Sequence, residues 1–348
     1  MKSRALKNWT PPRSWKRIRT IDAHTGGEPL RVIVDGLPRV PGRTILEKRR
    51  WFKKNLDPVR RGLMWEPRGH ADMYGAVVTE PVTPDGDLGV LFIHNEGLST
   101  MCGHGIIALA TVAVETGLVG LNRPETRIAI DTPAGRVTAF ARVEAGSRRV
   151  RSVRFYNVPS FVDTLDGVVD VPGIGQVTYD LAFGGAYYAY VQAGPLGLRL
   201  TPDNARALID AGMAIKRAVM AARPIVHPFA KDLGFLYGTI FIGPPLGRGA
   251  QSRNVCIFAE GEVDRSPTGT GVSGRVALHH ARGELKLGRK TVVESIVGSR
   301  FSGRAVEEVG FGRFRAVIPE VGGSASIIGR NELLFDPADP FRAGFFIR

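Results

Sequence analysis

Two short loops of this chain share a pattern of glycines and place a cysteine and a threonine at the same position. The first loop, Thr-Met-Cys-Gly-His-Gly (100–105), contains Cys102, and the second, Ser-Pro-Thr-Gly-Thr-Gly (266–271), contains Thr268. With Cys102 aligned on Thr268, three pairs of glycines coincide, namely Gly103 with Gly269, Gly105 with Gly271, and Gly117 with Gly283. Each segment therefore predicts a loop, a helix that starts at the Gly-x-Gly, and a glycine that ends it.

A helix N-terminus carries unpaired N–H groups and the positive end of the helix dipole. It binds carboxylates and lowers the pKa of a nearby thiol. Two such ends in one chain favour a site that holds one small acid between them. Because Cys102 stands at the start of one helix, we expect it to be the reactive group.

The other reading of a free cysteine is that of a small buried hydrophobic residue. We accept that reading for Cys256, which lies in the apolar stretch Asn-Val-Cys-Ile-Phe (254–258). A nucleophile pair of Cys102 with His104 is not expected, since residues two apart on a helix do not face each other. No G-x-S-x-G or protease-like signature supports acyl transfer.

The second loop belongs to the longer segment Val-Asp-Arg-Ser-Pro-Thr-Gly-Thr-Gly (263–271). Asp264 can accept hydrogen bonds from a substrate ammonium group, or it can simply tie down the turn. The N–H groups of Gly269 and Thr270 can point at a carboxylate. Thr268 cannot serve as a base at neutral pH, because an aliphatic hydroxyl is far too weak an acid.

Metal and nucleotide sites are not expected. The seven histidines are scattered without the spacing of metal ligands. The Gly-x-Gly pairs lack both the preceding strand and the lysine of nucleotide-binding motifs. We therefore expect no metal site and no nucleotide-binding site.

The composition is that of an ordinary globular protein, with 348 residues, 43% hydrophobic and 23% charged. The net charge of +14 suggests nucleic acid binding, but seven of these charges lie in the first twenty residues, which leaves +14 − 7 = +7 on the rest. No nucleic-acid-binding motif accompanies the charge. The longest apolar run is too short to cross a membrane, and no secretory signal is visible. Two distant cysteines form no disulfide framework, which favours the cytoplasm.

Most of the chain predicts short β-strands joined by turns, which favours antiparallel pairing and an α+β fold. Helices are expected from Thr44 to about Leu56, after Cys102, and from Asp203 to Ala222. The helix after Cys102 is apolar on every side and should be buried all round. We therefore expect a curved, mainly antiparallel, β-barrel-like sheet around a central helix, built twice, with a boundary near residue 150.

Several segments together resemble the proline racemase family. They are the Met-Cys-Gly-His of the first loop, the Asp-Arg-Ser-Pro-x-Gly-Thr-Gly of the second, and the segments from Asp22 to Arg31 (DAHTGGEPLR), from Glu66 to Gly75 (EPRGHADMYG) and from Asp339 onward. The resemblance covers the chain from residue 20 to its end. Proline racemases and hydroxyproline 2-epimerases carry a cysteine in both loops. A threonine in the second loop, as at Thr268, is similar to trans-3-hydroxy-L-proline dehydratases.

The resemblance implies a fold like that of diaminopimelate epimerase, with the site in the cleft between two lobes. We expect residues 20–150 to form the first lobe and 151–335 the second, with a strand in 336–348 returning to the first lobe. Residues 1–19 are expected to be a flexible basic tail. No cofactor is used by the family. We expect a small imino acid as the binding partner, no nucleic acid or membrane, and allow for a homodimer.

The resemblance also implies a reaction, the dehydration of trans-3-hydroxy-L-proline to Δ1-pyrroline-2-carboxylate. Cys102 would remove the α-proton. Thr268 would contact the opposite face of the substrate ring through steric contact and hydrogen bonding, without acting as an acid or base. Asp264 and His104 would hold the ring nitrogen. The backbone N–H groups of Gly103, His104, Gly269 and Thr270 would hold the carboxylate. The alternatives are a proline racemase or hydroxyproline 2-epimerase and a non-catalytic imino-acid-binding protein.

Overall fold

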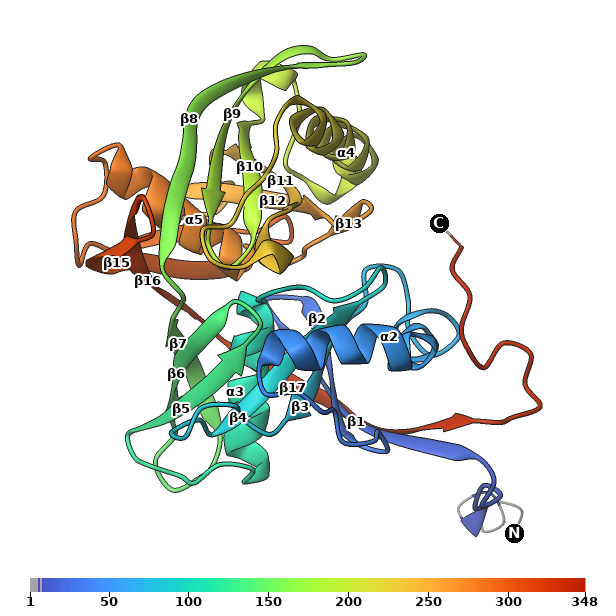
Figure 1. Cartoon of the computed structure of the whole chain (residues 1–348). Helices are drawn as coiled ribbons and strands as arrows, with labels where there is room; N and C mark the ends of the chain where they lie inside the picture. Colours follow the sequence, from blue (N-terminus) through green and yellow to red (C-terminus); the bar gives the residue numbers. More distant parts are fainter. Residues whose placement is uncertain (1–5, 7, 348) are drawn as a thin grey trace.

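A computed structural model describes residue 6 and residues 8–347. Two lobes are built around the buried helices α3 and α5 (Figure 1). The expected α+β fold with two similar lobes is confirmed. Among the described residues, no helix is both long and apolar enough to traverse a lipid bilayer.

The first lobe surrounds α3 and takes its strands from the beginning and the end of the chain. Its elements are β1 (Lys16–Thr25), β2 (Glu28–Asp35), α2 (Ile45–Met64), β3 (Tyr74–Thr79), β4 (Leu88–His94), α3 (Gly103–Thr116), β5 (Glu125–Thr132), β6 (Gly135–Val143), β7 (Val150–Tyr156) and β17 (Ala325–Phe335).

The second lobe surrounds α5. Its elements are β8 (Ser160–Val171), β9 (Gly175–Phe183), β10 (Tyr187–Gln192), the short helices η1 (Gly194–Leu196), η2 (Pro202–Asn204) and η3 (Lys231–Leu233), α4 (Ala205–Ala222), β11 (Leu236–Gly243), β12 (Ser252–Phe258), β13 (Glu262–Val263), α5 (Gly269–Ala281), β14 (Thr291–Glu294), β15 (Arg300–Phe311) and β16 (Phe314–Gly323).

The internal repeat extends beyond the two loops: the two lobes also share the same pattern of parallel and antiparallel strand pairs. In the first lobe, β2–β3 and β4–β5 are parallel, whereas β1–β2, β3–β4, β5–β6 and β6–β7 are antiparallel. In the second lobe, β10–β11 and β12–β14 are parallel, whereas β9–β10, β11–β12, β14–β15 and β15–β16 are antiparallel. Each parallel pair is joined by a helix, α2 and α3 in one lobe and α4 and α5 in the other, as parallel strands require a crossover.

The two central helices begin and end where the glycine pattern places them. Cys102 is the N-cap of α3, and α3 ends at Gly117, whose φ of 83° places it in the left-handed region. In the second lobe Thr268 is the N-cap of α5, and Gly283, with a φ of 73°, follows its last turn. All residues of α3 from Gly103 to Val114 are buried, as its apolar sequence predicts.

Three expected bounds differ from those in the structure. The strand that returns to the first lobe is β17, which pairs with β1 along Lys16–Thr25, whereas the described residues after Phe335 form turns and a single bridge from Phe345 to Glu66. The basic tail predicted for residues 1–19 ends earlier, because β1 already starts at Lys16; residues 1–5 and 7 of that tail lie outside the described part. Strand β7 follows the predicted lobe boundary near residue 150 and pairs both with β6 of the first lobe and with β16 of the second, so that boundary stays a prediction. The helix predicted to end near Leu56 continues to Met64.

The N-termini of α3 and α5 touch each other through two glycines. A Cβ atom added to Gly103 would lie 2.5 Å from the Cα of Gly269, and one added to Gly269 would lie 2.6 Å from the Cα of Gly103. Both distances are far below van der Waals contact. Glycine is therefore required at both positions by the close approach of the two backbones.

We expect the substitution Gly103→Ala to lower the free energy of unfolding by about 1–3 kcal/mol, the usual cost of forcing a group into a packed site. The matched control is Gly120→Ala, because no atom lies within 4 Å of a Cβ added there. Urea unfolding of the two variants measures the difference. Equal stability of both variants would show that the two helix ends do not press together in solution.

Candidate active site

All seven residues predicted to form the site lie around one small cavity of about 20 Å³ between the two lobes. They are Cys102, Gly103 and His104 from the first lobe and Asp264, Thr268, Gly269 and Thr270 from the second. The other lining residues are Tyr74, Met101, Tyr188, Tyr237, Cys256 and Phe258. The structure therefore brings together every residue that the sequence singled out.

Cys102 lies just outside α3, in an extended conformation with φ −144° and ψ 110°. Its Sγ accepts a hydrogen bond of 3.2 Å from the backbone N–H of Gly105. The thiol is buried, and burial raises its pKa well above the usual value, although the Gly105 hydrogen bond acts in the opposite direction. The lowered pKa expected from the helix end alone is therefore wrong for this closed site, because desolvation outweighs the backbone.

Cys102 and His104 contact each other, although helix geometry argued against this pair. The distance from Sγ to Nδ1 of His104 is 3.2 Å. The contact is possible because Cys102 is the N-cap and does not follow the helical spiral. Burial lowers the pKa of His104 to about 3, so the imidazole is neutral at physiological pH. The pair is thus a hydrogen bond between neutral groups and not a thiolate–imidazolium ion pair.

Asp264 both ties down its turn and faces the cavity. Its Oδ1 accepts a hydrogen bond of 2.7 Å from the N–H of Ser266. Burial raises its pKa to about 6, while the hydrogen bond from Ser266 acts in the opposite direction. The carboxyl group is therefore mostly ionised at neutral pH and is available to a cationic group of a ligand.

Thr268 does not have the backbone conformation of its counterpart Cys102. Its φ of 65° and ψ of 95° are unusual for a β-branched residue. Its hydroxyl oxygen lies close to the side chains of Asp264 and Cys256, without good hydrogen-bond geometry to either. The two loops thus match in sequence and in place but present their side chains differently.

Two sets of backbone N–H groups face one another at the Gly103–Gly269 contact. Those of Gly103 and His104 belong to the first turn of α3, and those of Gly269 and Thr270 belong to the first turn of α5. The first N–H groups of a helix have no partner within the helix. An anion between the two turns would interact with both sets.

One arginine connects the second loop to the first lobe. The backbone N–H of Arg265 donates a hydrogen bond of 2.7 Å to Oε2 of Glu28, and its guanidinium lies 3.5 Å from Oδ2 of Asp72. Glu28 is fully buried, and burial raises its pKa well above the usual value. Arg265 directly follows Asp264 in the chain. The contacts of Arg265 with the first lobe therefore also help to position Asp264.

Three tyrosines and Cys256 line the cavity although they were not predicted to do so. Tyr74 lies in the Glu66–Gly75 motif, which could have identified it, whereas no sequence motif marks Tyr188 or Tyr237. Cys256, assigned to the core, is fully buried as expected but also borders the cavity. Burial raises the pKa of each tyrosine above its usual value, so all three remain protonated.

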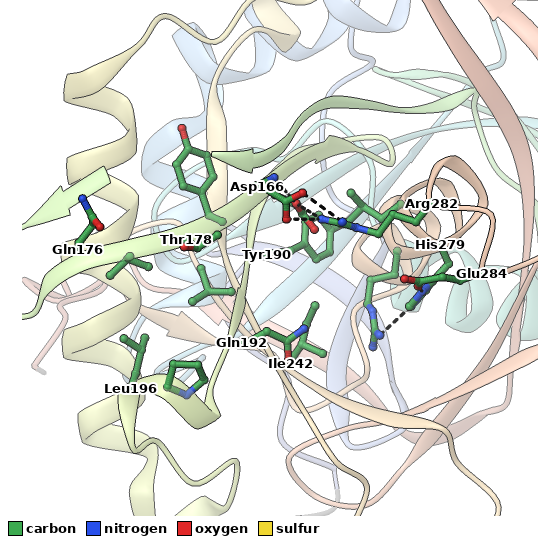
Figure 2. Close-up of a pocket in the computed structure, with 17 residues that line it drawn as sticks. Asp166, Gln176, Thr178, Tyr190, Gln192, Leu196, Ile242, His279, Arg282 and Glu284 are labelled. Atoms are coloured by element: carbon green, nitrogen blue, oxygen red, sulfur yellow. Dashed lines mark hydrogen bonds and ion pairs between the residues drawn. The ribbon is translucent and has the colours of Figure 1, made fainter. Parts of the chain in front are cut away.

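A larger cavity of about 450 Å³ lies in the second lobe beside α5 (Figure 2). Most of its charged side chains are paired with one another: Arg282 contacts Asp166 and Asp180, and His279 contacts Glu284, while Arg275 is hydrogen-bonded to His279. None of its lining residues is a cysteine, serine or lysine. The small cavity at Cys102 is therefore the better candidate for chemistry. Within the described residues, no cluster of side chains is suited to hold a metal ion.

We expect the alkylation of Cys102 by iodoacetamide to keep accelerating as the pH rises past 9, because only the thiolate reacts and burial raises its pKa. The rate is measured by mass spectrometry in a Cys256→Ala background, so that Cys102 is the only thiol that can be alkylated. A plateau of the rate between pH 6 and 8 would mean that the thiolate already predominates there, against this description of the site.

Comparison with known proteins agrees with this geometry. A match to the family described as proline racemase spans residues 20–346. The chain is 49% identical to a trans-3-hydroxy-L-proline dehydratase of Colwellia psychrerythraea, covering 99% of this chain and 97% of that protein. It is 48% identical to a 3-hydroxyproline 2-epimerase of Burkholderia multivorans, covering 96% and 99%.

Among solved structures, a hydroxyproline epimerase from Agrobacterium vitis with bound trans-4-OH-L-proline superimposes with a TM-score of 0.91 at 30% identity. The match covers 97% of this chain and 96% of that one. Both the sequence and the fold thus relate the protein to enzymes of imino acids. The chain belongs to the proline racemase family.

Proposed function

We propose that this protein removes water from trans-3-hydroxy-L-proline and forms Δ1-pyrroline-2-carboxylate, with Cys102 as the base. The observation that carries the proposal is a thiol at the N-cap of α3, where two helix N-termini meet, with a threonine at the matching N-cap of α5. The names of several relatives, such as the Colwellia dehydratase, support the same reaction.

The site offers a partner for each charged group of an imino acid. The carboxylate fits between the N–H groups of Gly103 and His104 and those of Gly269 and Thr270, where each helix end contributes roughly 0.3–2 kcal/mol. The ring ammonium fits against Asp264, with neutral His104 as a second contact. Donors that are fixed in advance stabilise the charge that develops as the α-proton leaves.

Cys102 must lose its own proton before it can act. Its thiol is neutral in the closed cavity, so we infer that the thiolate forms while the site is hydrated or as the substrate ammonium arrives. A cavity of about 20 Å³ is on the scale of one water molecule and not of an imino acid. The lobes therefore open for substrate and close over it, which excludes water from the reaction.

The position of the leaving group suits a single base. In trans-3-hydroxy-L-proline the hydroxyl lies opposite the carboxylate and hence on the same face of the ring as the α-hydrogen. Cys102 takes that hydrogen, the C2–C3 double bond forms, and the C3–O bond breaks with its electron pair on oxygen. The proton carried by Cys102 then completes a water molecule, and the enamine tautomerises to the cyclic imine.

The rival function is racemisation or 2-epimerisation, as in the named activity of the Burkholderia multivorans relative. That reaction needs an acid on the opposite face of the α-carbon, where Thr268 supplies only a hydroxyl. The product distinguishes the two functions, because dehydration gives a cyclic imine and epimerisation gives an imino acid with inverted configuration at the α-carbon. A cytoplasmic location and a homodimer stay predictions.

We expect Cys102→Ser to lower turnover of trans-3-hydroxy-L-proline by at least about 10²–10⁴-fold, the usual contribution of a general acid–base group. Binding of the planar analogue pyrrole-2-carboxylate should be retained, because backbone N–H groups hold the carboxylate. Cys256→Ala is the matched control and should keep most of the activity. Near-normal turnover by the Cys102→Ser protein would remove Cys102 from the mechanism.

We expect Thr268→Cys to exchange the α-proton of L-proline with solvent deuterium and to form some D-proline, because it adds a thiol on the far face. The gain should be small, since the backbone at position 268 differs from that at Cys102 and a misplacement of about 1 Å costs about 10²-fold. Thr268→Ser is the control. Chiral chromatography detects the inversion, and efficient racemisation by the unmodified protein would refute the role of Thr268.

A further inference from the structure

A cluster of buried hydroxyl groups lies on the Cys102 side of the cavity and has no role in the chemistry described so far. Tyr74, at the start of β3, donates a hydrogen bond of 2.5 Å to Oγ of Ser99. The hydroxyl of Tyr237, on β11 of the other lobe, lies 3.3 Å from that of Tyr74. Both tyrosine side chains border the same cavity as Cys102.

One hydroxyl group of this cluster, that of Tyr237, is free to donate a hydrogen bond to a ligand. The proton of Tyr74 is directed to Ser99 at a short distance, so Tyr74 offers an oxygen to Tyr237. The distance of 3.3 Å between the two phenol oxygens is longer than an ordinary O–H···O hydrogen bond of about 2.7–2.8 Å. The Tyr237 hydroxyl is therefore held weakly and can turn to a ligand at little cost.

The rings of the two tyrosines are fixed by their neighbours. Tyr74 packs edge-on against the imidazole of His104 at 4.8 Å between ring centres. Tyr237 packs on Phe258 at 5.4 Å. Nδ1 of the same His104 lies 3.2 Å from Sγ of Cys102, so the contact with His104 places Tyr74 on the Cys102 side of the cavity. The cluster thus stands on the face of the substrate from which, under the proposed function, the α-proton is removed.

We propose that Tyr237 is a catalytic residue that donates a hydrogen bond to the departing 3-hydroxyl group, with Tyr74 and Ser99 as positioning residues. This inference rests on the proposed function, which places the 3-hydroxyl on the Cys102 face. The phenol of Tyr237 stays protonated because burial raises its pKa well above the usual value. It therefore acts as a donor and not as a base.

The step balances without any further reactant. As the C3–O bond breaks, the electron pair moves to oxygen, and the Tyr237 O–H stabilises the developing negative charge. The proton that Cys102 removed from the α-carbon completes the water molecule. Tyr237 keeps its own proton, and Cys102 returns to the thiolate. The donor lowers the barrier to C–O cleavage and leaves removal of the α-proton unchanged.

The cavity contains a matched control for this role. Tyr188 also borders the cavity, but its hydroxyl lies 2.8 Å from Oγ1 of Thr270, on the α5 side. Tyr188→Phe and Tyr237→Phe therefore each remove one buried phenol hydroxyl from the same cavity. Only Tyr237→Phe removes a group from the side of the leaving hydroxyl.

The experiment compares two leaving groups in the full-length enzyme. Imine formation is measured with trans-3-hydroxy-L-proline and with trans-3-fluoro-L-proline, because fluoride needs far less help from a donor than hydroxide. Tyr237→Phe should lose on the order of 10²-fold in kcat with the hydroxyl substrate, as for removal of one donor to a developing oxyanion. With the fluoro substrate its loss should be at least about tenfold smaller. Tyr188→Phe should lose equally with both.

Exchange of the α-proton with deuterium from the solvent is the second measurement. Tyr237→Phe should keep exchanging the α-proton of the hydroxyl substrate while its elimination is slow. Ser99→Ala, which loosens Tyr74, should show the same leaving-group preference to a smaller degree and serves if the Tyr237 variant does not fold. Equal losses with both substrates, or no loss at all, would overturn the role of Tyr237. Absence of imine with the unmodified enzyme would instead refute the proposed function.

Discussion

The contact on which the rest of the structure depends is that between Gly103 and Gly269, where two helix N-termini meet backbone to backbone. Two positive dipole ends repel each other, so the packing of both lobes must hold them together. The carboxyl group of Asp264, which borders the same cavity and is mostly ionised at neutral pH, offsets part of this repulsion. A bound carboxylate offsets more, because it interacts with both ends at once. Affinity for an anion is thus a consequence of the fold itself.

The similarity of the lobes also shows where they have diverged. Both repeat the same order of parallel and antiparallel pairs, and both end the central helix with a glycine. They differ at the helix N-cap, which is an extended cysteine in α3 and a threonine with a positive φ in α5. A local change of backbone and side chain therefore separates a helix N-cap that carries a thiol from one that carries only a hydroxyl group.

The part of the site that lies around the two helix starts could be predicted from the sequence, whereas little could be predicted of the part that comes from other strands. The glycine offsets located both helix starts and the seven residues around them, because capping depends on neighbours in the chain. Tyr188 and Tyr237 come from strands brought close only by tertiary packing, so no local pattern marked them. The same holds for the thiol pKa, since the helix end is visible in sequence but burial is not. The Cys102–His104 contact was missed because helix spacing was applied to a residue outside the helix.

Arg265 gives the site one further property. It follows Asp264 directly and binds Glu28 and Asp72 of the opposite lobe, so the carboxyl group that faces the cavity and the contact between the lobes belong to adjacent residues. Under the proposed function, in which the lobes open and close, the dissociation constant of a ligand that engages Asp264 includes the equilibrium between open and closed lobes, as for any site whose competent state is only partly populated. Two ligands with identical contacts will differ in affinity if only one of them permits closure.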